Sequence, residues 1–92
     1  MRIALNFRGQ LANALGGSSD QIEINSSSSI NSILQDLAYR GGTAFTDIAF
    51  DCHGKPSRTL LVAVDGEQIT DFEMALAPDT QEITFIPPIA GG

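Results

Sequence analysis

Residues 26–42 read SSSSINSILQDLAYRGG, and they carry the clearest structural signal in the sequence. Five apolar residues recur at the spacing of one helix face: Ile30, Ile33, Leu34, Leu37 and Ala38. One of the serines Ser26 to Ser29 is expected to cap the helix, because a serine oxygen accepts hydrogen bonds from the first helical turn. Gly41-Gly42 predicts the end of the helix, where a left-handed residue is usual. The stretch therefore predicts one amphipathic helix on a core.

Strand patterns lie on both sides of this helix. Residues 1–7 alternate, with Ile3, Leu5 and Phe7 on one face, which predicts a half-buried strand. Further strands are expected at residues 21–25, 60–64, 67–69 and 82–86. Residues 60–64 are apolar on both faces and predict an interior strand, and Asp65-Gly66 predicts the tight turn that follows it. Residues 43–58 are less regular, with Phe45, Ile48 and Phe50 expected to cover the edge of the core.

The order strand, strand, helix, strand, short strand, strand resembles the β-grasp, or ubiquitin-like, arrangement. We therefore expect an α+β fold with a mixed sheet of four to five strands and one main helix packed across one face. Residues 1–86 are expected to form this single domain. Residues 87–92 are expected to form a flexible C-terminal tail.

Composition narrows the class of partner. The chain has 92 residues, an apolar fraction of 42%, five Lys and Arg, and a formal net charge of −6. Nucleic acids and anionic membranes need clustered positive charge, so neither is expected as a partner. Acidity favours a partner with a basic docking face, or serves only to keep the protein in solution. Cys52 is the single cysteine, no signal peptide or membrane-spanning run is apparent, and a cytoplasmic location is expected.

The sequence ends in Phe85-Ile86-Pro87-Pro88-Ile89-Ala90-Gly91-Gly92. A terminal carboxyl is ionised near neutral pH and reacts as an electrophile only after it gains a leaving group, which adenylation by ATP supplies. Ala90, Gly91 and Gly92 are slim enough to thread a narrow channel, because glycine has no Cβ. Pro87 and Pro88 end the strand and stiffen the tail. The sequence predicts that this tail presents the Gly92 carboxylate to the active site of another protein.

This terminus closely resembles that of the small subunit of molybdopterin synthase, and more broadly of the ubiquitin-like sulfur carriers of thiazole and cysteine synthesis. The resemblance is specific from about Leu60 to Gly92 and includes Val62-Ala63-Val64-Asp65-Gly66-Glu67. It implies that an activating enzyme adenylates Gly92, that a thiocarboxylate forms there, and that a synthase subunit accepts the sulfur. ATP would serve that enzyme, and the chain itself is expected to bind no cofactor or metal and to act as a carrier without catalytic machinery.

A surface for such partners is expected beside the tail. If Ile83 and Phe85 pack under the helix, Ile86 faces away from it, and Leu61 or Ala63 on the neighbouring strand lies next to it. An exposed apolar pair at the root of a tail is a plausible docking site. The alternative is that the segment with Phe45 to Phe50 covers both Ile86 and Leu61.

Two other functions stay open, and one local motif is discounted. The same acyl-adenylate could be captured by a lysine, which would make the chain a protein modifier conjugated through Gly92. The chain could also be an interaction domain whose tail is incidental. Cys52-His53 is not expected to be a nucleophile or metal site, because the sequence has no further Cys or His to complete a ligand set.

Overall fold

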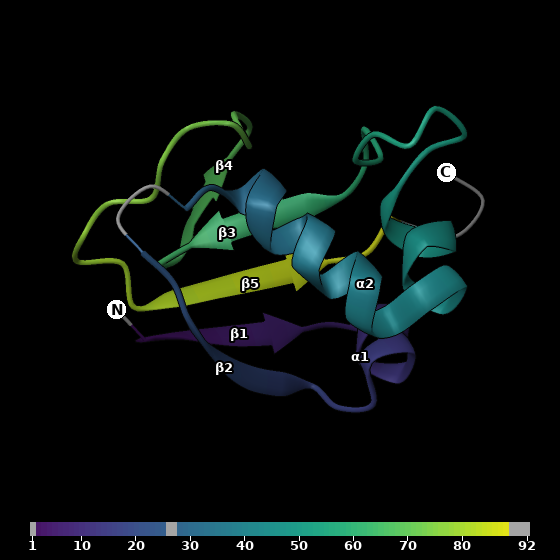
Figure 1. Ribbon diagram of the computed structural model, residues 1–92, viewed down its shortest axis with the longest axis horizontal. Helices are drawn as coiled ribbons and strands as arrows, with labels where there is room; N and C mark the ends of the chain where they lie inside the picture. The colour runs from purple at the N-terminus through teal and green to yellow at the C-terminus, as the bar shows by residue number, and fades with distance from the viewer. Residues whose placement is uncertain (1, 26–27, 89–92) are drawn as a thin grey trace.

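The computed structural model describes residues 2–25 and 28–88. They form a five-stranded mixed sheet in the order β2-β1-β5-β3-β4, with helix α2 crossing one face (Figure 1). The elements are β1 (Arg2–Phe7), α1 (Gln10–Leu15), β2 (Ser19–Glu23), α2 (Ile30–Ala49), β3 (Leu61–Val64), β4 (Glu67–Ile69) and β5 (Glu82–Ile86). This is the β-grasp arrangement that the sequence predicts. In the described ranges no helix combines the length and apolar character needed to cross a membrane.

The last strand, β5, lies in the middle of the sheet. It pairs parallel with β1 and antiparallel with β3. Ile83 and Phe85 are fully buried on the side of the helix, as their parity predicts. The rings of Phe7 and Phe85 stack with their centroids 5.8 Å apart, so β1 and β5 are joined by side chains as well as by hydrogen bonds.

Helix α2 begins at a reciprocal serine cap. The backbone N–H of Ser32 donates to Oγ of Ser29 over 3.2 Å, and the N–H of Ser29 donates to Oγ of Ser32 over 3.0 Å. This arrangement satisfies two groups at the helix end, with serine in the place that Glu or Gln usually takes. The cap is therefore Ser29, the last of the four candidate serines, and the predicted stripe that follows it is buried from Ile30 to Leu37.

The first helical segment of α2 ends at the glycine pair, as predicted, and a second segment that was not predicted follows it directly. Gly42, at φ 60° and ψ −149°, interrupts the helical path, and the chain then resumes the helix as far as Ala49. Glycine tolerates such angles both at a stop and at a kink, and the burial of Phe45 and Ala49 favours the kink here. A Cβ on Gly41 would lie 2.6 Å from the Cβ of Phe45, so this glycine allows the two halves to approach closely.

The turn between β3 and β4 also holds the start of β5. Asp65 and Gly66 both have positive φ, as a two-residue hairpin turn requires. The Asp65 carboxylate accepts hydrogen bonds from the backbone N–H groups of Gln81, over 3.1 Å, and Glu82, over 2.9 Å. The predicted turn is confirmed, and its aspartate ties two segments that are distant in sequence.

The core of the helix face can be tested at Leu37, which is buried, against Tyr39, which is 91% exposed on the same helix. Leu37→Ala should lower the free energy of unfolding by about 2–5 kcal/mol, because it leaves a cavity in the core. Tyr39→Ala should change it by about 0.5 kcal/mol or less. Urea denaturation of both variants measures the difference, and equal effects would show that this part of the helix does not pack as described.

Candidate functional site

The tail leaves the sheet at the end of its central strand. Ile86 is the last residue of β5, and Pro87 and Pro88 are the last residues that the structure describes. Proline has no N–H to continue a strand ladder, so the pairing of β5 with β3 stops at Ile86. In Figure 1 the end of β5 lies close to the segment that joins α2 to β3. The predicted threading residues Ala90 and Gly91, and the predicted reactive residue Gly92, lie outside the described residues.

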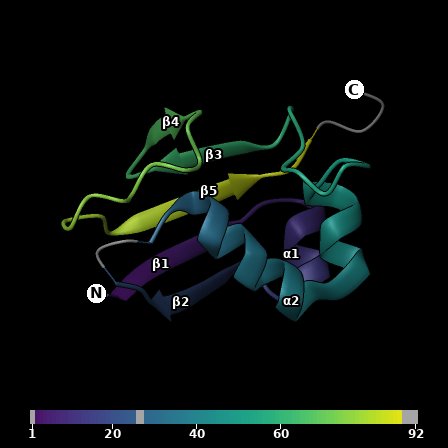
Figure 2. The same ribbon diagram turned by 45° about the horizontal axis from the view of Figure 1, so that its top comes forward.

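An apolar pair is exposed at this point. Leu61 of β3 lies directly opposite Ile86 of β5, and the two side chains are 40% and 36% exposed. Because Phe85 packs under α2, Ile86 faces the opposite side of the sheet. Figure 2 shows that α2 lies on one face of the sheet, and this is the face on which Phe85 is buried. The parity prediction for Leu61 and Ile86 is therefore confirmed, and neither side chain is buried by the segment from Phe45 to Phe50. We call these two residues the tail-root patch.

Gly9, which directly precedes α1, lies next to the root of the tail. Gly9 has φ 52° and ψ −127°, angles that are open to glycine and costly for other residues. A Cβ at this position would lie 3.3 Å from Cγ of Pro87. The adjacent N–H of Arg8 donates to the carbonyl oxygen of Phe85 over 3.0 Å. Arg8 thus binds the backbone just before Ile86, and Gly9 leaves room for Pro87 just after it, an arrangement with no local sequence signal.

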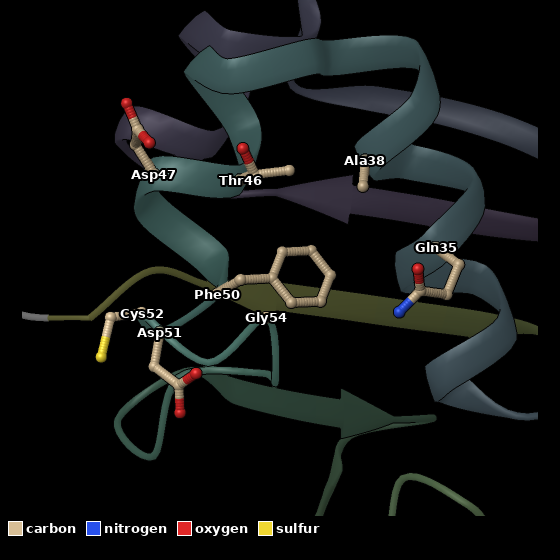
Figure 3. Close-up of a pocket in the computed structure, with 8 residues that line it drawn as sticks. All are labelled: Gln35, Ala38, Thr46, Asp47, Phe50, Asp51, Cys52 and Gly54. Atoms are coloured by element: carbon tan, nitrogen blue, oxygen red, sulfur yellow. The ribbon is translucent and has the colours of Figure 1, made fainter.

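A separate hollow lies beside α2 and does not gather a reactive set of side chains. A cavity of about 560 Å³ opens between α2 and the loop after it. In Figure 3 the ring of Phe50 points into this space, whereas the side chains of Asp51 and Cys52 point away from it. Among the described residues no three His, Cys, Asp or Glu side chains are grouped to hold a metal ion.

Asp51 has a local structural role. Its carboxylate accepts hydrogen bonds from the backbone N–H groups of Lys55, over 3.1 Å, and His53, over 2.8 Å. These bonds, that from Lys55 first, lower the pKa of Asp51 below its ordinary value. Asp51 is thus engaged in holding this loop, and the tail root, where an apolar pair is exposed at the end of β5, is the better candidate for the functional site.

The contact of Gly9 with Pro87 can be tested against Gly16, at the other end of α1. Gly16 also has positive φ, but a Cβ there would meet no atom within 4 Å. Both Gly9→Ala and Gly16→Ala should destabilise the fold by roughly 1–3 kcal/mol through backbone strain. Only Gly9→Ala should couple to Pro87→Ala, because removing Cγ relieves the close contact. A double-mutant cycle in urea should give a coupling of about 0.5 kcal/mol or more at Gly9 and none at Gly16; additivity at both positions would contradict the contact.

Several solved structures have the same fold. SAMP1 from Haloferax volcanii matches with a TM-score of 0.80 and 20% identity over 100% of each chain. A Pyrococcus furiosus protein assigned as subunit 1 of molybdopterin converting factor matches with a TM-score of 0.72 and 13% identity, over 97% of this chain and 99% of the other. A chain from the complex of subunits 1 and 2 of molybdopterin-converting factor from Helicobacter pylori gives 0.57 and 18%, over 100% of each chain. At these identities the likeness shows the fold alone.

Sequence comparison identifies the family. No curated protein sequence matches the chain. The model of the ThiS family, in contrast, matches residues 5–92, which include the second half of β1, the whole of β5 and residues 87–92. That match covers nearly the entire chain, and it agrees with the β-grasp sheet and with the tail that follows its central strand. The chain belongs to the ThiS family of ubiquitin-like sulfur carriers.

Proposed function

We propose that the chain carries sulfur as a thiocarboxylate on Gly92, and that it serves as the small subunit of a molybdopterin synthase. The observation that supports this most is the position of the tail root. The tail follows Ile86, the last residue of the central strand β5. Ile86 and its neighbour Leu61 on β3 are both exposed. A partner that binds this pair would receive the tail at the same time.

The chemistry requires three steps, and each takes place in the active site of another protein. A carboxylate oxygen of Gly92 attacks the α-phosphate of ATP, and pyrophosphate leaves. The terminal sulfur of a persulfide then attacks the carbonyl carbon and displaces AMP, and a thiol cleaves the resulting disulfide to leave the thiocarboxylate. On a synthase subunit the thiocarboxylate sulfur finally displaces a leaving group from the substrate, and water hydrolyses the resulting thioester, which returns the Gly92 carboxylate and leaves the sulfur on the substrate. In this proposal the chain is a cytoplasmic protein that acts as a substrate and a sulfur carrier. ATP is bound and used by the activating enzyme.

The residues at the root suit this role. Pro87 and Pro88 restrict φ and lack N–H donors, which lowers the entropy lost when a tail is ordered in a channel. Gly91 and Gly92 have no side chains to obstruct such a channel. The molybdopterin pathway is favoured over thiamine or cysteine synthesis by the Pro-Pro pair, and by the molybdopterin-converting factor subunits among the structures with the same fold.

A protein modifier is the second candidate, favoured by the match to SAMP1, whose full name is small archaeal modifier protein 1. Both functions start from the same acyl-adenylate. They separate at the acceptor, which is sulfur for the carrier and a lysine amine for the modifier. Denaturing blots of cell lysate distinguish them, because only the modifier gives discrete high-mass bands that disappear when Gly92 is deleted.

The proposed function is tested by mass spectrometry of the intact protein. The purified chain is first shown to end at Gly92, and is then incubated with ATP, its cognate activating enzyme and a persulfide donor. Its mass should rise by the difference between one sulfur and one oxygen atom. Deletion of Gly92 should abolish the change and leave the unfolding midpoint unaltered, because the tail is expected to contribute little to the core. An unchanged mass for the full chain would overturn the proposal.

The tail-root patch can be tested separately with Ile86→Asp. A charge in this apolar contact should weaken binding to the activating enzyme or synthase subunit by about tenfold or more, or at least ~1.4 kcal/mol. The matched control is Met74→Asp, since Met74 is an exposed apolar residue, at 60%, that lies outside the patch. Isothermal titration measures binding, and thermal unfolding checks both variants. Equal binding by the two variants would exclude the patch as a docking site.

A further inference from the structure

The five cationic side chains of this acidic chain fall into two groups. Two of them are in ion pairs: Nε of Arg2 lies 3.1 Å from Oε1 of Glu23, and Arg40 pairs with Asp20. These hydrogen bonds are the first cause of the lowered pKa of Glu23 and of Asp20. The other three are Arg8, Lys55 and Arg58. None of these three has an ion pair with any other residue in the described ranges.

The three unpaired cations lie around the tail-root patch. Arg8 follows β1 directly, is bonded through its N–H to Phe85, and shares a hollow with Thr84 of β5. Lys55 and Arg58 line a groove of about 360 Å³ together with Leu61. Arg8 is thus on the β1 side of Ile86, whereas Lys55 and Arg58 are on the β3 side.

Carboxylates nearby do not neutralise these cations through direct contact. Glu73 lines the groove of Lys55 and Arg58, and Glu82 lines the hollow of Arg8. Neither carboxylate lies within ion-pair distance of a described cation. Within residues 2–25 and 28–88, therefore, no carboxylate occupies the side-chain donors of these three cations, which leaves them available to a partner.

We propose that the tail-root patch and its three cations form one docking surface, which fits a protein whose tail-accepting entrance is apolar at its centre and carries carboxylates on either side. This inference rests on the proposed function and names the partner surface that would receive the tail. It reverses the expectation from net charge, which favours a basic partner. At physiological salt the Debye length is about 8 Å, so charges at the contact outweigh the charge summed over the molecule. Complementary charges at the rim of an interface mainly raise the association rate and the selectivity for a partner.

Charge reversal separates local charge from net charge. Arg8→Glu, Arg58→Glu and the control Arg2→Glu each make the chain more negative by the same amount. Binding to the cognate activating enzyme, measured by stopped flow as a function of salt, should weaken by about tenfold for Arg8→Glu and Arg58→Glu, mostly through a slower and less salt-dependent association. Arg2→Glu should change binding by about twofold or less, and circular dichroism confirms that each variant is folded. Tighter binding by all three variants would identify a basic partner and overturn the inference.

Lys55 offers a direct readout, because it is the only lysine in the sequence. A zero-length carbodiimide joins an amine to a carboxylate in contact with it. In the complex with the activating enzyme, it should link Lys55 to an Asp or Glu beside the entrance for the tail, as located by peptide mass spectrometry. Lys55→Arg keeps the charge and should keep the affinity while losing the cross-link. A complex that forms normally with no cross-link at Lys55 would count against the acidic entrance.

The two proposals fail in different ways. If the unaltered chain acquires no sulfur, the proposed function falls, and this inference falls with it. If the chain is activated normally but Arg8→Glu and Arg58→Glu behave like Arg2→Glu, the inference fails and the sulfur-carrier proposal stands.

Discussion

The parallel pairing of β5 with β1 determines where the core, the exposed pair and the tail root lie. Two parallel strands that are adjacent in a sheet require a long crossover between them, and here that crossover contains α2, which covers one face and buries Phe85 beneath it. The same pairing places the end of β5 beside the end of β1. The root of the tail therefore meets Gly9 on one side and Leu61 on the other. Core, patch and tail position all follow from one strand pair.

Local patterns predicted the elements that local physics controls. The apolar stripe after Ser29 and the parity of Ile83 and Phe85 gave the main helix and the buried face of the last strand. The second half of α2 escaped prediction because the angles of Gly42 suit a stop and a kink equally, and the burial of Phe45 chooses between them. The approach of Gly9 to Pro87 brings together residues near opposite ends of the chain, and neither local sequence contains a pattern that predicts it. The roles of residues 89–92 remain predictions from sequence.

The electrostatics show why composition is a weak guide to a binding surface. A net charge of −6 states a sum and says nothing of where each charge lies. Pairing with Glu23 and Asp20 occupies Arg2 and Arg40. The other three cations have no ion pair among the described residues: Arg8 is bonded to Phe85 through its N–H, and Lys55 and Arg58 line a groove with Leu61. An acidic protein can therefore carry unpaired positive side chains next to the root of its tail. Only the arrangement of strands reveals this segregation.

The central position of β5 also determines how the molecule bears mechanical load. A partner that pulls on the tail would apply force along the axis of β5, which is hydrogen-bonded to β1 on one side and to β3 on the other. Force along β5 shears its hydrogen bonds to β1 and to β3 at the same time. These hydrogen bonds share the load and do not break one after another. The carboxylate of Asp65 anchors the start of the same strand through Gln81 and Glu82. The sheet therefore resists deformation when the C-terminal end of β5 is pulled.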